Sequence, residues 1–427
     1  MDFAFSAKSE SLRRQLRAFM DQHVIPRHRQ FVAEETQGRY PISFMADLQA
    51  RARSEGLWNL FLPRLADDEG GTRLSNLEYA PLAEIMGALV WASEVFNCSA
   101  PDTGNMELLH MFGTPEQKAQ WLRPLLNGAI RSCFAMTEPD VASSDATNVT
   151  TAIRRDRDHY VINGRKWFIT GAANPACKIA IVMGKTAFDA EIHRQQSMCL
   201  VPLDTPGVRI VRDLTVMHHH SHVTHAEILF DNVRVPSSNL LGQEGDGFAM
   251  AQARLGPGRI HHCMRCIGQS ELALKLMVDR VQERKAFGRP LAESDSIQQA
   301  IARSRCEIEQ ARLLVLRAAW TIDNHGSKAA RNDIALIKVV APEMQLRVVD
   351  RAIQAFGAMG LSPDTPLPDL WTTGRTLRIA DGPDEVHLRS IARHEIKQAQ
   401  ATRGDSHRFY TQPDRSIERD MRASDQA

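Results

Sequence analysis

Two short segments carry side chains that could bind a flat ligand with polar edges. The first, residues 134–145, offers the hydroxyls of Thr137, Ser143 and Ser144 in a loop interrupted by proline. Hydroxyls and backbone N–H groups in such a loop can bind a phosphate or the edge of a heteroaromatic ring, although an ordinary turn has the same composition. In the second segment, Trp167-Phe168-Ile169-Thr170, an aromatic residue lies two positions from a hydroxyl. Residues two apart on a strand share one face, so this pair could contact a cofactor ring and hydrogen-bond its edge.

A cluster of histidines invites a metal interpretation. On a strand, His218, His220 and His222 would share one face. The cluster also contains His219 and His225, but no Cys, Asp or Glu lies among these residues. We therefore predict no metal site and expect a polar strand end that lines a cleft or an interface.

The composition excludes several classes of protein. Lys and Arg number 52 and Asp and Glu 51, so a net charge of +1 argues against a nucleic-acid binder that acts through bulk charge. No run approaches the ~18 apolar residues that a membrane helix needs, so we expect no membrane span. Seven scattered cysteines indicate reduced thiols, and the N-terminus has no apolar signal core. We therefore expect a cytoplasmic protein.

The pattern of apolar residues divides the 427 residues into four parts. Residues 1–130 are predicted to be helical, and residues 246–400 to form a helical bundle, because apolar side chains recur there at helical spacing. Residues 131–245 contain short β-rich runs separated by Gly and Pro, which argues against a doubly wound nucleotide-binding fold. Residues 401–427 are polar and charged, and we expect them to be frayed or wrapped on a neighbouring chain.

Local signals predict individual elements within these parts. Asn163-Gly164 predicts the tight turn of a hairpin between strands at 160–162 and 166–170. Apolar residues at helical spacing predict one long buried helix across 297–318 and another across 334–348.

Five motifs, in order along the chain, resemble the acyl-CoA dehydrogenase family. The family's flavin loop, T-E-P-G-A-G-S-D, is similar to FAMTEPDVASSD with one extra residue, and its second flavin segment to INGRKWFITGAA. The run that leaves the β domain resembles FDNVRVPSSNLLGQEGDGF, the Arg-x-x-Phe-Gly signature resembles ERKAFGRPL, and the Q-x-x-G-G-x-G segment resembles IQAFGAMGL. The stretches LGPGRIHHC and IADGPDEVHL resemble the branch of family members ten and eleven. The resemblance implies an α+β multidomain fold with an N-terminal helical domain, a central β-barrel-like domain and a C-terminal four-helix bundle.

The same resemblance implies FAD as the cofactor. Phe168 would flank the isoalloxazine ring, and Thr170 would hydrogen-bond near flavin N5. Arg284 would bind the diphosphate of the FAD of one subunit, and Gln354 and Gly357 that of its neighbour. The full set of implied cofactor contacts is Phe134, Met136, Thr137, Ser143, Ser144, Phe168, Thr170, Arg284, Phe287, Gln354, Gly357, Pro383 and Glu385.

The catalytic base of the family is a Glu in a Y-E-G-T stretch, where this chain has Ala380-Asp381-Gly382-Pro383. The resemblance implies that Asp381 is the base, with a side chain shorter by one methylene; a helix-capping role is the alternative. Some members carry the base just before Arg259 instead, but residues 255–258 here contain no acid. We expect burial against flavin and acyl chain to raise the pKa of Asp381. The implied substrate contacts are Ser144, Arg259 and Gly382.

These assignments imply FAD-dependent oxidation of a saturated acyl-CoA to trans-2-enoyl-CoA. Electrons would pass to an electron-transferring flavoprotein, and the shared cofactor site implies a homodimer or homotetramer. One alternative is an acyl-CoA oxidase that uses O2, disfavoured because the chain lacks the large extra C-terminal domain of many oxidases. Another is a nucleic-acid-binding flavoprotein of the same fold, disfavoured because the tail mixes charges of both signs. The branch suggests long, branched or 4-substituted acyl groups.

Overall fold

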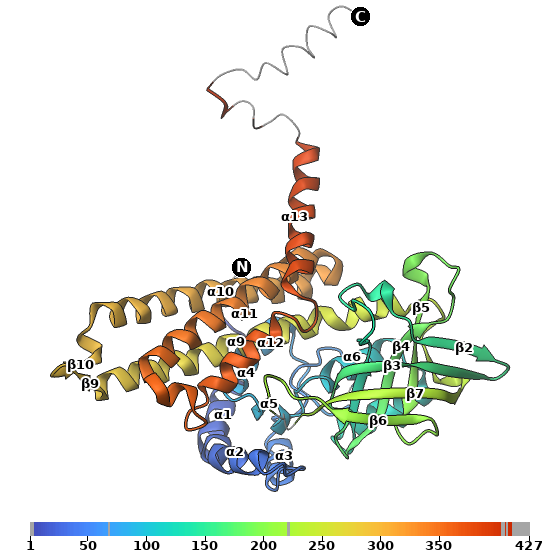
Figure 1. Cartoon of the computed structure of the whole chain (residues 1–427), viewed down its shortest axis with the longest axis horizontal. Helices are drawn as coiled ribbons and strands as arrows, with labels where there is room; N and C mark the ends of the chain where they lie inside the picture. Colours follow the sequence, from blue (N-terminus) through green and yellow to red (C-terminus); the bar gives the residue numbers. More distant parts are fainter. Residues whose placement is uncertain (1–3, 67–68, 220–222, 403–405, 407–408, 412–427) are drawn as a thin grey trace, which may run out of the picture.

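Three blocks of structure follow one another along the chain in the computed structural model, which describes residues 4–66, 69–219, 223–402, 406 and 409–411 (Figure 1). A helical block comes first, an eight-stranded sheet second and a set of long helices third. This order confirms the predicted fold class. Among the described residues, no helix combines the length and the apolar character needed to cross a membrane.

The N-terminal block consists of short helices around a buried one. Its α-helices are α1 (Ala7–Phe19), α2 (His28–Thr36), α3 (Met45–Ser54), α4 (Asn76–Gly87), α5 (Ala92–Val95), α6 (Asp102–Phe112), α7 (Pro115–Gln117) and α8 (Arg123–Leu126). A capping box between Ser75 and Glu78 opens α4, because each side chain accepts from a backbone N–H that the first turn leaves unpaired. Helix α6 is buried along eight consecutive residues from Asp102, four of them polar or charged.

The central block is a mainly antiparallel sheet. Its strands are β1 (Arg131–Ala135), β2 (Ala152–Asp156), β3 (His159–Thr170), β4 (Cys177–Lys185), β5 (Gln196–Pro202), β6 (Val208–Asp213), β7 (His225–Pro236) and β8 (Leu240–Leu241). The strand order is β6-β7-β3-β2-β4-β5-β8, and β1 pairs with β4 in parallel. The longest pairing joins β3 to β7, so the two segments with functional signals, 167–170 and 225, lie side by side in the sheet.

The predicted hairpin turn at Asn163-Gly164 is wrong. Strand β3 runs straight through these residues, pairing with β2 on one side and β7 on the other. A Cβ on Gly164 would come within 2.3 Å of Thr151 Oγ1, so the glycine permits close packing against that residue. The turn lies instead between β2 and β3, where Arg157 adopts φ +58°.

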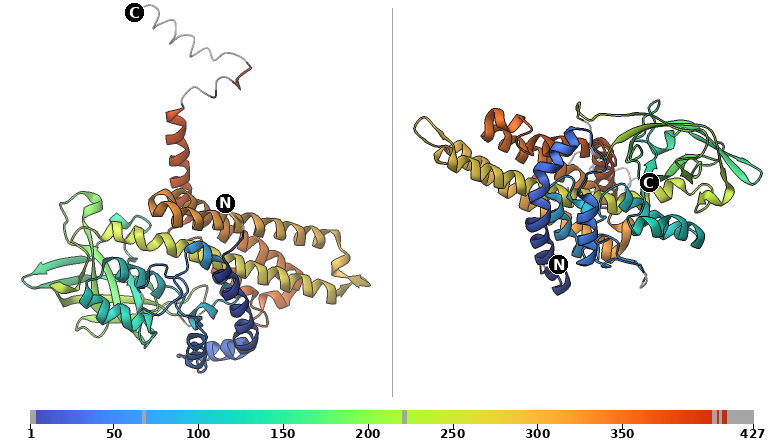
Figure 2. Two further views of the ribbon diagram at one scale, coloured as in Figure 1. Left: turned by 180° about the vertical axis from the view of Figure 1, so that it is seen from behind. Right: turned by 90° about the horizontal axis from the view of Figure 1, so that it is seen from below.

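The third block is built on three long helices. Helix α9 (Gly247–Glu283) is followed by the small hairpin of β9 (Lys285–Ala286) and β10 (Arg289–Pro290), then by α10 (Asp295–Ala329), α11 (Arg331–Phe356), α12 (Leu367–Leu377) and α13 (Asp384–Ala401). The long helices predicted across 297–318 and 334–348 are confirmed as α10 and α11. At about 1.5 Å per residue, α9 is roughly 55 Å long and runs from the sheet to the opposite end of the bundle (Figures 1 and 2).

The last helix, α13, projects from the body of the protein (Figure 1). Its first turn is anchored by the buried residues Asp384 and His387, whereas Leu388 and Ile396 are exposed. Most of the polar tail predicted to be frayed or wrapped on a neighbour, residues 403–405, 407–408 and 412–427, lies outside the described residues.

Candidate functional site

Asp381 lies in the turn between α12 and α13, with φ +57°. Its carbonyl oxygen accepts a hydrogen bond from Arg259 Nε on α9 at 2.7 Å, and the preceding carbonyl accepts one from Lys338 Nζ on α11 at 2.7 Å. Gly382 follows with φ +103°, and a Cβ there would approach His387 Nε2 to 2.9 Å. The turn is therefore fixed from two helices of the bundle, while the Asp381 side chain keeps 23% of its surface exposed.

The environment of the Asp381 carboxylate is cationic. Its Oδ2 lies 3.6 Å from His262 Nε2. Burial acts to raise the pKa of Asp381, but neighbouring basic groups outweigh it and leave the pKa below its ordinary value; they are His262, Arg254, Lys338 and Arg259. Burial and the charge of Arg265 lower the pKa of His262 itself to about 3, although Asp381 acts to raise it.

The rise in the pKa of Asp381 expected from burial against flavin and acyl chain stays a prediction; the residues of the chain itself lower this pKa. Burial is present as expected, but α9 and α11 bring positive charge close to the carboxylate, which sequence reasoning did not place there. The capping alternative for Asp381 receives no support, because the N-cap residue of α13 is Pro383 and no side chain caps it.

One side of the Asp381 carboxylate faces the glycine-containing turn of α9. A Cβ built on Gly258 would lie 3.9 Å from Asp381 Oδ2, an ordinary contact distance. The position at which some family members carry an acid is thus close to Asp381 in space, and here it carries no side chain.

The loop that carries Thr137, Ser143 and Ser144 is held by a buried ion pair. Lys166 Nζ on β3 donates to Glu138 Oε1 at 2.9 Å and to the carbonyl oxygen of Met136 at 2.8 Å. The Glu138 carboxylate also accepts from the backbone and hydroxyl groups of Thr150 and Thr151. This carboxylate therefore stays ionised, with its pKa lowered to about 2 by Lys166 and these hydrogen bonds against the effect of burial. The network fixes both ends of the loop to the sheet.

Several predicted cofactor contacts gather beside this loop. The N–H of Trp167 donates to the carbonyl oxygen of Thr137 at 3.0 Å, which places the loop against the 167–170 segment. Phe168 has φ +50° and is 44% exposed, so the backbone holds an aromatic ring outward. The hydroxyl of Ser143 bonds within the loop, to the N–H of Glu138 at 2.9 Å, whereas Ser144 is exposed.

Phe134, another predicted cofactor contact, packs against a cation of α9. Its ring lies under the guanidinium of Arg254, 4.2 Å from ring centroid to Cζ. It therefore links β1 to α9 and positions Arg254 near Asp381.

A second group of predicted residues lies at the opposite end of the bundle. Arg284 ends α9, and Phe287 is fully exposed at the tip of the β9–β10 turn. From His262 to Arg284 the chain advances 22 residues, roughly 33 Å at about 1.5 Å per residue. Arg284 and Phe287 therefore cannot join the Asp381 site of their own chain (Figure 1).

The Gln354–Gly357 segment lies beside Arg284, not apart from it. The guanidinium of Arg280 sits 5.4 Å from the ring centroid of Phe356, so the ends of α9 and α11 are adjacent. Gln354 and Gly357 are exposed there, and Gly357 has φ +68°. The two segments therefore lie together at the far end of the bundle.

A chain of buried polar groups connects α9 to the N-terminal block. Arg254 Nε donates to Asn105 Oδ1 at 3.1 Å, Asn105 Nδ2 to Ser132 Oγ at 2.9 Å, and Ser132 Oγ to Asp102 Oδ1 at 2.6 Å. Asp102 in turn pairs with Arg131. This series of hydrogen bonds links α6, β1 and α9 behind the site.

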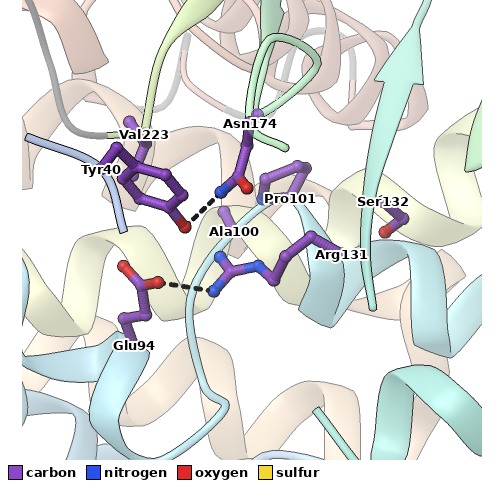
Figure 3. A pocket seen from close by; sticks show the side chains of 9 residues that line it. Tyr40, Glu94, Ala100, Pro101, Arg131, Ser132, Asn174 and Val223 are labelled. Atoms are coloured by element: carbon purple, nitrogen blue, oxygen red, sulfur yellow. Dashed lines mark hydrogen bonds and ion pairs between the residues drawn. The ribbon is translucent and has the colours of Figure 1, made fainter. Parts of the chain in front are cut away.

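Arg131 leads to a small polar pocket between the N-terminal block and the sheet (Figure 3). Arg131 binds Glu94 at 2.9 Å, and Asn174 hydrogen-bonds the Tyr40 hydroxyl. The pocket is lined by paired polar groups and does not include Asp381, so it serves the packing of the two blocks.

Glu107 is a buried acid on α6 near Arg254. Its Oε2 has no hydrogen-bond partner among the described residues. Burial raises the pKa of Glu107 from 4.5 to about 8, against the opposing effect of Arg254. The folded protein therefore holds this carboxyl protonated at neutral pH.

We expect Glu107→Gln to change how stability depends on pH. Between pH 4.5 and 8 the unfolded chain ionises Glu107 and the folded chain does not, so the native Glu costs stability as pH rises. From pH 5.5 to 8 this cost grows by about 3 kcal/mol, which the neutral Gln avoids. Urea unfolding of the FAD-loaded protein at pH 5.5 and pH 8 should show that the free energy of unfolding of the variant rises relative to that of wild type as the pH increases. The exposed Glu55→Gln is the control; an equal change in both variants would contradict the assignment.

Sequence reasoning missed His262, Arg254 and Lys338. Two signals were present. Arg254, Gly258 and His262 are spaced four residues apart, which places them on one face of a helix. Lys338 stands alone among apolar residues on the buried face of the 334–348 helix, a position where a charge needs dedicated partners.

Comparison with known families covers nearly the whole chain. The acyl-CoA dehydrogenase N-terminal domain matches residues 6–129, the middle domain residues 133–233 and the C-terminal domain residues 245–396. The chain belongs to the acyl-CoA dehydrogenase family. This membership confirms the resemblance seen in the motifs and identifies the protein as an enzyme of that family.

Among its relatives, the probable acyl-CoA dehydrogenase FadE2 of Mycobacterium tuberculosis is 58% identical over 94% of this chain and 98% of its own length. The acyl-CoA dehydrogenase family member 10 of Mus musculus is 54% identical over 90% of this chain, which spans only 36% of the mouse protein. The structure of butyryl-CoA dehydrogenase from Megasphaera elsdenii superposes with a TM-score of 0.80 at 26% identity, covering 93% of this chain and all of that one.

Acyl-CoA dehydrogenases are FAD-dependent, and the residues of this chain fit that cofactor. The exposed ring of Phe168, with the hydroxyl-bearing residues Thr137 on the adjoining loop and Thr170 on the same strand, suits a flat ring with polar edges. The exposed Arg284 suits a diphosphate.

Proposed function

We propose that the protein oxidises a saturated acyl-CoA to trans-2-enoyl-CoA, with Asp381 as the base. The observation that carries this proposal is the Asp381 carboxylate itself. It is fixed by Arg259 and Lys338 through backbone carbonyls, yet its side chain is left partly exposed opposite Gly258. A carboxylate that is held in place but not used for structure is suited to take a proton from a bound ligand.

The residues around Asp381 have distinct tasks in this proposal. Asp381 removes the α-proton, and its own N–H donates to the thioester carbonyl, which makes that proton more acidic. A bound FAD would supply the acceptor for the hydride that leaves the β-carbon. Arg259 keeps Asp381 oriented through its carbonyl, and Gly382, with φ +103°, permits the turn that holds it.

The cationic surroundings keep Asp381 deprotonated and ready in the free enzyme. A carboxylate with a low pKa is a weak base. An acyl chain that displaces water from the partly exposed side chain would add desolvation, which raises the pKa and strengthens the base.

The proposal extends to the cofactor contacts and partners. Phe134, Met136, Thr137, Ser144, Phe168, Thr170, Pro383 and Glu385 would hold FAD from one chain, with Ser143 supporting the loop. Arg284, Phe287, Gln354 and Gly357 would reach it from a second chain, because they lie at the far end of the bundle. The proposal therefore requires at least a homodimer. An electron-transferring flavoprotein would accept the electrons.

Anaerobic bleaching of the bound flavin by a series of acyl-CoAs tests this function. The series runs from short to very long chains and includes branched and 4-substituted acyl groups. We expect one class to bleach the visible absorption band of the bound flavin promptly and the others slowly. Rapid reoxidation by O2 with formation of peroxide would favour the oxidase alternative. Failure of every acyl-CoA to reduce an FAD-loaded protein would contradict the proposal.

A further inference from the structure

The histidine cluster contains one member that the proposed function does not explain. His218 and His219 are exposed, and His220 and His222 lie outside the described residues. Among the described residues, no group of His, Cys, Asp or Glu could hold a metal ion. His225 differs from the exposed members, because it is half-buried and begins β7 directly opposite Thr170.

The side chains of this pair are in contact. His225 Nδ1 lies 3.1 Å from Thr170 Oγ1, a hydrogen-bond distance. Thr170 is the last residue of β3, two positions after the exposed Phe168. The imidazole therefore lies next to the hydroxyl that the proposed function assigns to the edge of the flavin.

The backbone around His225 is held on several sides. Its N–H donates to Asp213 Oδ1 at 2.7 Å, and its carbonyl accepts from the N–H of Leu214 at 2.8 Å. The preceding Thr224 has φ +57°, a left-handed conformation that is costly for a β-branched residue. The carbonyl of Thr224 accepts from the N–H of Gly171 at 3.2 Å, which locks this turn to the end of β3. The position of the ring is thus fixed relative to Thr170.

A hydroxyl has one proton, so the state of its neighbour decides which way that proton points. If His225 Nδ1 carries a proton, it donates to Thr170 Oγ1, and the hydroxyl proton is directed elsewhere. If Nδ1 lacks a proton, it accepts from Thr170, and the hydroxyl can offer a ligand only its lone pairs. The two arrangements would present opposite hydrogen-bond characters to the same cofactor atom.

We propose that His225 is a positioning residue that donates from Nδ1 to Thr170, so that the Thr170 hydroxyl donates to the flavin edge. The inference rests on the proposed role of Thr170 at the cofactor. It assigns to His225 no contact with the reacting atoms. This role accounts for a histidine at position 225, directly after the strained Thr224.

The test compares His225→Phe, Thr170→Val and the double variant in the FAD-loaded protein. FAD affinity and the visible absorption spectrum of the bound flavin are measured for each. Loss of one hydrogen bond corresponds to about a 3- to 10-fold weaker affinity. We expect His225→Phe to weaken FAD binding by this amount and to shift the flavin band in the same direction as Thr170→Val. The double variant should add nothing to Thr170→Val alone, because His225 acts only through that hydroxyl.

Conservative variants separate positioning from simple packing. His225→Gln retains an N–H donor and should restore most of the affinity and the spectrum, whereas His218→Asn should leave both unchanged. If His225→Phe does not fold, His225→Leu, which is smaller and equally unable to donate, takes its place. Additive effects of the two single variants would overturn the proposal, as would a wild-type spectrum in His225→Phe.

The outcome for Thr170→Val alone identifies where a failure lies. If Thr170→Val leaves affinity and spectrum unchanged, the role of His225 falls together with that of Thr170. Substrate-dependent bleaching in that same variant would still stand as evidence for the dehydrogenase reaction. The two proposals are therefore distinguishable in one set of proteins.

Discussion

Replacing Asp381 with Asn should abolish substrate-dependent flavin reduction while leaving FAD bound. Asn has the shape of Asp and preserves the backbone bond to Arg259, but its amide cannot accept the α-proton. Loss of a positioned general base corresponds to about 10²- to 10⁴-fold in rate. The measurement is stopped-flow bleaching of the flavin with the best acyl-CoA, alongside the visible spectrum of the resting enzyme.

Two further variants make this result specific to the proton acceptor. Asp364→Asn removes an exposed carboxylate elsewhere in the bundle and should bleach at the wild-type rate. Asp381→Glu keeps the carboxylate and adds one methylene, and position 258 on the facing part of α9 carries no side chain, so the variant should retain much of the activity. Rapid bleaching by Asp381→Asn would remove Asp381 from the mechanism.

The low pKa of Asp381 in the free enzyme sharpens this prediction. A pKa below the ordinary value means that the group is ionised throughout the neutral range. The rate of flavin reduction should then fall at acid pH with the pKa of Asp381 in the enzyme–substrate complex, because the added desolvation raises that pKa above its value in the free enzyme. The charges that set this balance come from α9 and α11, far from Asp381 in the sequence.

The fold was predictable where periodicity was long. The stretches 297–318 and 334–348 repeat apolar residues over many turns, and both are helices. Predictions from short sequence motifs were wrong where tertiary contacts determine the local conformation. Asn163-Gly164 favours a turn in isolation, but pairing of β3 on both edges leaves no place for one.

Only those residues of the candidate site that stand within a recognisable motif could be predicted from the sequence. Asp381 and Arg259 were identified because each stands in a recognisable stretch. The Glu138–Lys166 pair and the His225–Thr170 bond join residues 28 and 55 positions apart. No local pattern reports such contacts; they follow from the register of the sheet, which the sequence alone leaves open.

Phe287→Ala should weaken FAD binding even though the side chain touches nothing in its own chain. The ring is fully exposed at the tip of a turn in which Phe287 and Gly288 both have positive φ, and a Cβ on Gly288 would meet no atom within 4 Å. A chain that holds a large apolar ring in water gains nothing from it unless a partner covers it.

Any effect of this substitution must therefore act through a second chain. Loss of a central aromatic anchor costs about 2 kcal/mol or more, roughly 30-fold in affinity. We expect Phe287→Ala to lower FAD affinity by about this factor and to favour smaller oligomers, as measured by FAD titration and light scattering. Phe188→Ala, which removes a partly exposed aromatic from the sheet domain, is the control. If FAD affinity and oligomer size both stay unchanged, a cofactor site shared between chains is contradicted. If FAD affinity falls and the oligomers become smaller together, the far end of each bundle lies at its neighbour's flavin.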